Sequence, residues 1–241
     1  MGLVSAIIII ALWGIHLWWM LVRMPFGDGS LFDGVHAGVH ILIQGYLFTG
    51  LFITAHDAIH GTVWRSRRIN TIVGTICALL FAGLSYRRLS QNHHLHHAHP
   101  ADDDGDPDFH PSNRFLPWFA AFMRRYATIW QFVFMGVAFN VLKIWIAEPR
   151  LWLFWIVPAF LGALQLFTIG TYLPHRKPHS HDMPHNARSM KLNHALAMVS
   201  CYFFGYHTEH HLSPGTPWWR LWRVKEQRQG ALHGNRGSEL S

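Results

Sequence analysis

Charged residues and cysteines are scarce in this chain. Only 14% of its 241 residues are charged, whereas half are apolar, and a soluble domain of this size usually carries more charge. The two cysteines, Cys77 and Cys201, show no metal-like pairing. We expect both to be packing residues, and the shortage of charge directs attention to a membrane.

Apolar stretches long enough to cross a bilayer, about 20 residues each, occur at four places. They are roughly 3–22, 35–55, 126–147 and 151–173. A fifth apolar run, 71–84, is too short to cross and suits a re-entrant or interfacial hairpin better. The sequence therefore predicts an all-α integral membrane protein with about four transmembrane helices.

The chain also lacks signs of processing or division. Its first apolar stretch has neither a basic start nor a small-residue cleavage site, so we expect it to be retained. No internal repeat and no Gly/Ser linker is evident, which predicts one domain over 1–241. The polar tail from about 225 has no periodicity, and we expect it to be frayed.

The basic residues are distributed unevenly around the predicted spans. With 71–84 not crossing, only Arg23, Lys143 and Arg150 lie near one face, and the others lie near the face that carries most histidines. By the positive-inside rule the histidine-rich face is cytoplasmic. We expect the net charge of +7 to attract anionic headgroups, and we expect no nucleic-acid binding, because the basic residues flank membrane spans.

Histidine, in contrast, is abundant, with 20 residues. Three clusters have helical spacing, so each directs two or three imidazoles from one helix face at a common centre. Eight imidazoles exceed the four to six ligands of a single transition metal, which predicts two metal ions. The clusters are His56 and His60; His93, His96 and His97; and His207, His210 and His211.

The choice of metal rests on the surroundings, because imidazole binds zinc, copper, iron and nickel alike. A closed structural zinc site is usually rich in cysteine, and these clusters have no thiolate and lie at a membrane face. Iron in oxygen chemistry on a lipid-soluble substrate is the better interpretation. The alternatives are a pH-sensitive histidine surface or a metal-handling tract, neither of which needs this repeated spacing.

Other residues near the clusters have supporting roles or none. Asp57 and Glu209 lie inside clusters but off the ligand face, so we expect them to support ligands. The acidic run with Asp104, Asp106 and Asp108 either orients ligating imidazoles or forms a solvated loop. Candidates for lining a substrate slot, with interfacial packing as the alternative for the two tryptophans, are Phe203, Phe204, Tyr206, Trp218 and Trp219. We expect packing roles for His16, His36 and His40.

The three boxes HxxxH, HxxHH and HxxHH around four spans resemble those of the membrane di-iron superfamily of fatty-acid desaturases, alkane hydroxylases and carotenoid-oxygenating enzymes. Further stretches resemble the bacterial β-carotene ketolases. These are "HDAIHG" at 56–61, "NHHLHHAHP" at 92–100, "DDDGDPDF" at 102–109, "TYLPHR" at 171–176, "HNARS" at 185–189 and "FGYHTEHHLSPGTPWWRL" at 204–221.

The resemblance implies oxidation of the ring methylene at carbon 4 of β-carotene to a ketone, giving echinenone and then canthaxanthin, or astaxanthin from zeaxanthin. Two hydroxylations at one carbon give a geminal diol, which loses water. The implied cofactors are two Fe²⁺ ions with O₂ as co-substrate. Because no flavin, haem or nicotinamide motif is visible, electrons must come from a donor such as a ferredoxin. The implied location is the bacterial inner membrane.

The resemblance also implies a ninth nitrogen ligand just after the last span. His175 in "TYLPHR" has that position, and His99, three residues after His96, is the main rival. The later histidines fall in or beyond a proline-containing stretch that favours a loop. They are His179, His181, His185 and His194.

Two kinds of rival function remain open. A fatty-acid desaturase or hydroxylase, or a carotenoid 3-hydroxylase, would share the three boxes, although "TYLPHR", "HNARS" and "TPWWRL" favour the ketolases. A histidine-rich metal transporter would need ligands near the middle of the membrane, and these boxes lie at the span ends.

Overall fold

The computed structural model describes residues 1–27 and 30–238, with side chains as far as Ala231. Its described residues form helices joined by loops, with a single isolated β-bridge between Ser189 and Tyr206. The α-helices are α1 Gly2–Val22, α2 Leu31–Ile59, α3 Arg67–Ala82, α4 Tyr86–Ala98, α5 Phe115–Tyr126, α6 Ile129–Leu142, α7 Glu148–Leu151, α8 Val157–Leu166, α9 Leu173–His175, α10 His194–Cys201, α11 His207–Leu212 and α12 Leu221–Ser238. π-helical turns, Trp152–Ile156 and Phe167–Tyr172, join α7, α8 and α9.

Three helical stretches are long and apolar enough to cross a membrane. They are α1, α2 and the continuous helix Glu148–His175, and they agree with the spans predicted at 3–22, 35–55 and 151–173. The outward faces of these helices are apolar; Ile7, Ile8 and Leu12 of α1 are exposed. Exposed apolar faces of this extent are typical of contact with lipid. The chain is thus an all-helical membrane protein.

The fourth predicted span, 126–147, is shorter in the structure. Helix α6 covers only Ile129–Leu142, about 21 Å at 1.5 Å per residue, against a hydrocarbon core of about 30 Å. Its start is fixed by Thr128, whose hydroxyl accepts a hydrogen bond from the Gln131 amide at 3.1 Å. Hydropathy extended the predicted span because Tyr126, which belongs to α5, and Ile144 and Trp145, which lie in a turn after α6, are apolar too.

The chain bends sharply after α3 instead of continuing in the direction of that helix. A 104° bend separates α3 from α4, and it occurs at Gly83, whose φ of +67° is readily adopted by glycine. Residues 71–82 of the predicted hairpin all lie in α3 and the bend follows at their end, so the hairpin consists of α3 and α4. Because His60 before α3 and His93 in α4 are in contact, with 2.8 Å between their Nε2 atoms, the two ends of the hairpin meet at one place.

We predict that single cysteines in place of Arg67 and Arg87 will react from the same side of the membrane with an impermeant thiol reagent. The two sites flank a hairpin whose histidines meet, and a crossing would separate them by a full bilayer. The native thiols of Cys77 and Cys201 are buried, so background labelling will be low. Labelling from opposite sides would contradict a shared site.

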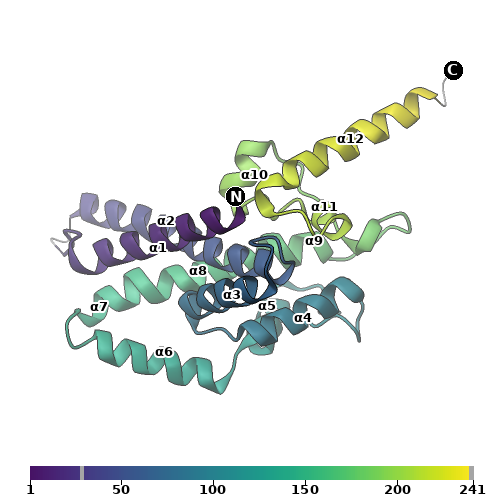
Figure 1. The fold of residues 1–241 in the computed structure, drawn as a ribbon. Helices are drawn as coiled ribbons and strands as arrows, with labels where there is room; N and C mark the ends of the chain where they lie inside the picture. Colours follow the sequence, from purple (N-terminus) through teal and green to yellow (C-terminus); the bar gives the residue numbers. More distant parts are fainter. Residues whose placement is uncertain (28–29, 239–241) are drawn as a thin grey trace.

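Most of the connecting structure gathers at one end of the long helices. Figure 1 shows α1, α2 and α7–α8 extended towards one end and α9–α12 at the other. At the first end Arg150 donates to the carbonyls of Met20 and Met24, at 2.9 and 2.8 Å. Arg150 and Arg23 therefore share an end, as the distribution of basic residues predicted.

The C-terminal segment differs from the prediction. Instead of being frayed from about 225, the chain is helical through α12 as far as Ser238. Lys, Glu, Gln, Arg and Ala between 225 and 231 are good helix formers. Arg228 also bonds Glu209 at 3.0 Å, which ties α12 to α11. Residues 239–241, also part of the predicted tail, lie outside the described residues.

Candidate metal centre

The structure brings together all nine histidines that the sequence and the resemblance indicated. Their ring nitrogens form two groups, and within each group the nitrogens lie within 4.8 Å of one another. We call the first group site A and the second site B. Site A consists of His56, His60, His93, His97 and His210, and site B of His96, His175, His207 and His211.

Helical spacing explains how two HxxHH boxes serve two sites. In α4 the i and i+4 residues, His93 and His97, belong to site A, and His96 between them turns to site B. In α11 the i and i+4 residues, His207 and His211, belong to site B, and His210 turns to site A. Each box therefore gives its i, i+4 pair to one site and its i+3 residue to the other. The sequence predicted a common centre for each box, and this division is the correction.

Within each site the Nε2 atoms point at one another. In site A the Nε2–Nε2 distances are 2.8 Å for His60 and His93, 2.9 Å for His97 and His210, and 3.2 Å for His56 and His210. In site B they are 3.1 Å for His96 and His211 and 3.1 Å for His207 and His211. Nitrogens at right angles around an ion with metal–nitrogen bonds of about 2.1 Å lie about 3.0 Å apart. The donor sets thus fit bound metal ions.

Most of these imidazoles are neutral at physiological pH, which is the form that ligates metals. His96 is the exception: burial acts to lower its pKa, but the hydrogen bond to Asp106 and the charge of that carboxylate outweigh burial and raise it. Burial, followed by the neighbouring histidines, lowers the pKa of His207, His210 and His211 well below the usual value. Burial and the neighbouring His94 lower the pKa of His60 to about 4. Because these pKa values lie below 7, metal binding near neutral pH displaces few protons.

His175 belongs to site B and has the geometry of a ligand. Its Nδ1 lies 3.1 Å from the carbonyl oxygen of Asn186, to which it donates. The other nitrogen, Nε2, is buried and has no hydrogen-bond partner among the described residues. Its ring centroid lies 4.7 Å from that of His96 and 4.8 Å from that of His207. A lone pair held in this way is directed at the centre of site B.

The rivals for the ninth ligand lie elsewhere. His99, His181 and His185 are exposed. His179 bonds the backbone oxygen of His175, and His194 contacts Tyr206 and Glu226. Among the described residues none of the five belongs to a metal-holding group.

Three of the predicted carboxylates adjoin the histidines. Asp106 accepts from Nδ1 of His96 at 2.9 Å and from the backbone amide of Ala101 at 2.8 Å. Asp108 follows in the same buried loop and accepts from the Tyr126 hydroxyl at 2.6 Å. Asp57 has Oδ1 3.8 Å from Nδ1 of His56. His96, Asp106 and Asp108 also form a third possible metal-holding group, but their carboxylates already accept these hydrogen bonds.

The other two candidate supporting carboxylates do not contact the histidines among the described residues, and for Asp104 this agrees with the solvated-loop alternative. Asp104 is exposed at the outer part of the acidic loop. Glu209 is buried, but it bonds Arg228 at 3.0 Å and the Ser189 hydroxyl. Since helical phase turns Glu209 away from the histidines, it joins α11 to α12 and to the preceding loop.

Of the five aromatic residues predicted to line a substrate slot, only Phe204 lines a cavity at the histidines. It lines a small cavity of about 20 Å³ bordered by His56, His93, His96 and His207. Tyr206 is fully buried against another cluster and donates to the Leu192 carbonyl at 3.1 Å. Phe203 packs against that cluster too. A left-handed turn at Tyr202 and Phe203 separates these neighbours in space.

A larger apolar cavity, about 580 Å³, lies beside the small one. Sequence reasoning missed its residues on α5 and α6, among them Phe122, Tyr126 and Phe132. The only available signal was the apolar face of α5, which did not indicate its target. Trp218 packs on Tyr202 and on the main core, away from both cavities.

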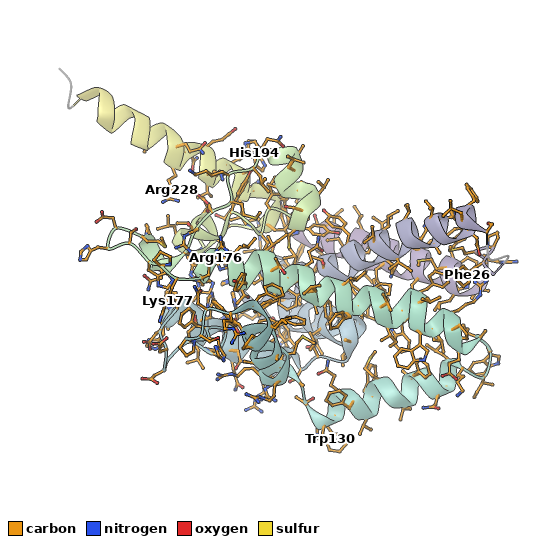
Figure 2. The ribbon with its side chains drawn as sticks, turned by 180° about the vertical axis from the view of Figure 1, so that it is seen from behind. Phe26, Trp130, Arg176, Lys177, His194 and Arg228 are labelled. Carbon is orange, nitrogen blue, oxygen red and sulfur yellow. The ribbon has the colours of Figure 1, made fainter. Side chains whose placement is uncertain are left out.

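The remaining α1 and α2 histidines lie apart from the nine. His16 contacts Nδ1 of His40 at 3.0 Å and Gln44 at 2.5 Å, and the rings of His36 and His40 are 4.7 Å apart. These contacts pack α1 on α2, as the sequence predicted. Figure 2 shows Phe26, near this end, opposite the end that carries Arg176, His194 and Arg228.

The described residues thus form a helical membrane protein in which nine clustered histidines, able to hold metal ions, lie beside apolar cavities. The chain belongs to the fatty acid desaturase family, whose model matches residues 34–152 and 117–237.

Several curated relatives are similar over most of the chain. A β-carotene ketolase of Paracoccus sp. (strain PC1) is 40% identical over 75% of this chain and 76% of its own length. Beta-carotene 4-ketolase 3 of Haematococcus lacustris is 38% identical over 81% of this chain and 63% of its own length. A zeaxanthin 4-ketolase of Chlamydomonas reinhardtii is 36% identical over 95% of this chain and 54% of its own length. The chain therefore spans a little over half the length of the algal relatives.

Proposed function

We propose that the protein is a β-carotene ketolase that converts the methylene at ring carbon 4 to a ketone. The single observation that carries the proposal is the pair of histidine sites next to an apolar cavity, in a chain similar to ketolases over most of its length. The products are echinenone and then canthaxanthin, with zeaxanthin as a second substrate class that one relative's name supports.

The nine histidines hold two iron ions in this proposal, one at site A and one at site B. When bound, the irons supply activation of dioxygen and removal of hydrogen from the allylic carbon. Each of two hydroxylations uses one O₂ and two electrons, and the resulting geminal diol loses water to give the ketone.

The surrounding residues orient the ligands and keep the site dry. The carbonyl of Asn186 and the carboxylate of Asp106 hold the protons on Nδ1 of His175 and His96, which leaves Nε2 free to ligate. Phe204, with Phe52 and Leu166, borders the histidines with apolar surface. A rigid polyene fits such a surface better than water does.

The same proposal assigns a membrane setting and an electron donor. The histidine end carries most basic residues, which supports a cytoplasmic orientation in a bacterial inner membrane. An acidic one-electron carrier such as a ferredoxin suits this basic face.

Expression in a bacterium that accumulates β-carotene tests the proposal. We expect the cells to turn from yellow-orange to red, with echinenone and then canthaxanthin identified by mass and retention. A matched strain expressing His93→Ala/His97→Ala should keep only β-carotene, since two site A ligands are lost. Unchanged β-carotene with verified expression, iron and aeration would contradict the proposal, and zeaxanthin alone would indicate a 3-hydroxylase.

A further inference from the structure

The large apolar cavity and the small cavity at the histidines share part of their lining. Four residues border both cavities: Phe52 of α2, Phe122 and Tyr126 of α5, and Leu166 of α8. We call these four residues the neck. Gln131, Phe132 and Met135 of α6 line the large cavity, and the residues of α6 are largely exposed and apolar. A substrate dissolved in the bilayer can therefore reach the histidines between α6 and α8 without passing through water.

One polar pair lies at the neck. The Tyr126 hydroxyl donates to Oδ1 of Asp108 at 2.6 Å, and Asp108 is buried and also borders the small cavity. Apart from the four histidines there, the only other polar side chain bordering the small cavity is Thr171. Neither Tyr126 nor Asp108 belongs to site A or site B.

Burying a polar pair beside an apolar cavity costs free energy, because each group gives up hydrogen bonds to water. Such a pair therefore suggests a polar partner in the cavity. The bond to Asp108 uses the phenol's proton, so the phenol oxygen can act only as an acceptor. The side chain of Asn92 also lies next to this oxygen, and its buried Nδ2 has no hydrogen-bond partner among the described residues. The open volume beside it is about 20 Å³, room for a single water-sized group. A hydroxyl group has that size.

In a 3-hydroxylated carotenoid ring, the hydroxyl group lies close to the carbon that is oxidised. Carbon 3 is bonded to carbon 4, so a 3-hydroxyl oxygen stands only two bonds from the carbon that is oxidised. A ring that enters through the neck with carbon 4 towards the histidines carries its 3-hydroxyl close to the neck. A non-hydroxylated ring brings only hydrogen there and needs no partner.

We propose that Tyr126, oriented by Asp108, is the residue that accepts the 3-hydroxyl of a hydroxylated carotenoid ring and so determines whether such rings are oxidised. This rests on the proposed ketolase function. Tyr126 acts on specificity: it adds a hydrogen bond for zeaxanthin and contributes only surface for β-carotene.

The test compares initial ketolation of β-carotene and of zeaxanthin in membranes that carry the wild type or Tyr126→Phe. We expect the ratio of kcat/KM for zeaxanthin to that for β-carotene to fall about tenfold, the effect of one lost buried hydrogen bond. Because both substrates are measured on the same enzyme, partial loss of folded protein cancels in the ratio.

Three further variants sharpen the result. Asp108→Asn weakens the acceptor that orients the phenol, and we expect a smaller fall in the ratio, about threefold. Tyr172→Phe removes a phenol outside both cavities and should leave the ratio unchanged. A fall in Thr171→Val with none in Tyr126→Phe would overturn the assignment.

Failure of the inference is distinguishable from failure of the proposed function. Wild-type membranes that ketolate neither carotenoid would contradict the function itself. Wild-type membranes that ketolate β-carotene but reject zeaxanthin, or a Tyr126→Phe variant that slows both substrates equally, would overturn the inference and leave the function standing.

Discussion

Alanine in place of His175 is expected to lower the iron content by about one ion per chain and to abolish ketolation. Site B has four histidines, against five in site A, so the loss of one leaves only three nitrogen ligands. The buried Nε2 of His175 has no hydrogen-bond partner among the described residues, which is the situation of a lone pair available to a metal. The measurement is iron per chain and ketone formed by purified protein.

Two matched variants control for the loss of a histidine as such. His99→Ala and His181→Ala each remove an exposed imidazole from the same end of the molecule, and both should keep two irons and full activity. Normal iron content and ketolation in His175→Ala would show that His175 is no ligand. The same loss in His99→Ala would show that the exposed position seen for His99 is not the one it takes with metal bound.

The histidine clusters could be predicted from the sequence because helical spacing is local. The i, i+3 and i+4 positions of α4 and α11 share one helix face whatever the rest of the chain does. How the boxes divide between two sites could not be predicted, because it depends on the angle between α4 and α11. His96 and His210 each leave their own box for the site of the other helix.

The position of His175 could be predicted only as a place along the chain. Its role as a ligand depends on the Asn186 carbonyl, eleven residues later in a loop, which fixes the Nδ1 proton. The residues around the apolar cavity are even harder to predict from the sequence. Phe52, Tyr126 and Leu166 lie on three helices far apart in sequence, and nothing in local spacing brings them together. Phe203 and Tyr206 were assigned to the substrate slot because they are close to a histidine box in sequence, but they pack in a separate apolar cluster.

Asp106 makes the clearest contact between the acidic loop and the histidines. Sequence reasoning left two roles open for this run, ligand support and a solvated loop. The structure divides them: Asp106 is buried on Nδ1 of His96, and Asp104 is exposed. Alternation between buried and exposed positions in a tight loop has no sequence signature as clear as that of a helix face.

We expect Asp106→Ala to reduce ketolation by about 10- to 100-fold, the usual cost of removing a carboxylate that orients a ligating histidine. The variant leaves Nδ1 of His96 and the Ala101 amide without their acceptor, so His96 loses both its orientation and the proton position that frees Nε2. Iron titration should show weaker binding at site B, with binding at site A retained. Asp104→Ala is the matched control, because its exposed carboxylate lies in the same loop. Equal activity in the two variants would mean that the bond from His96 to Asp106 holds the loop and does nothing for the metal ligand.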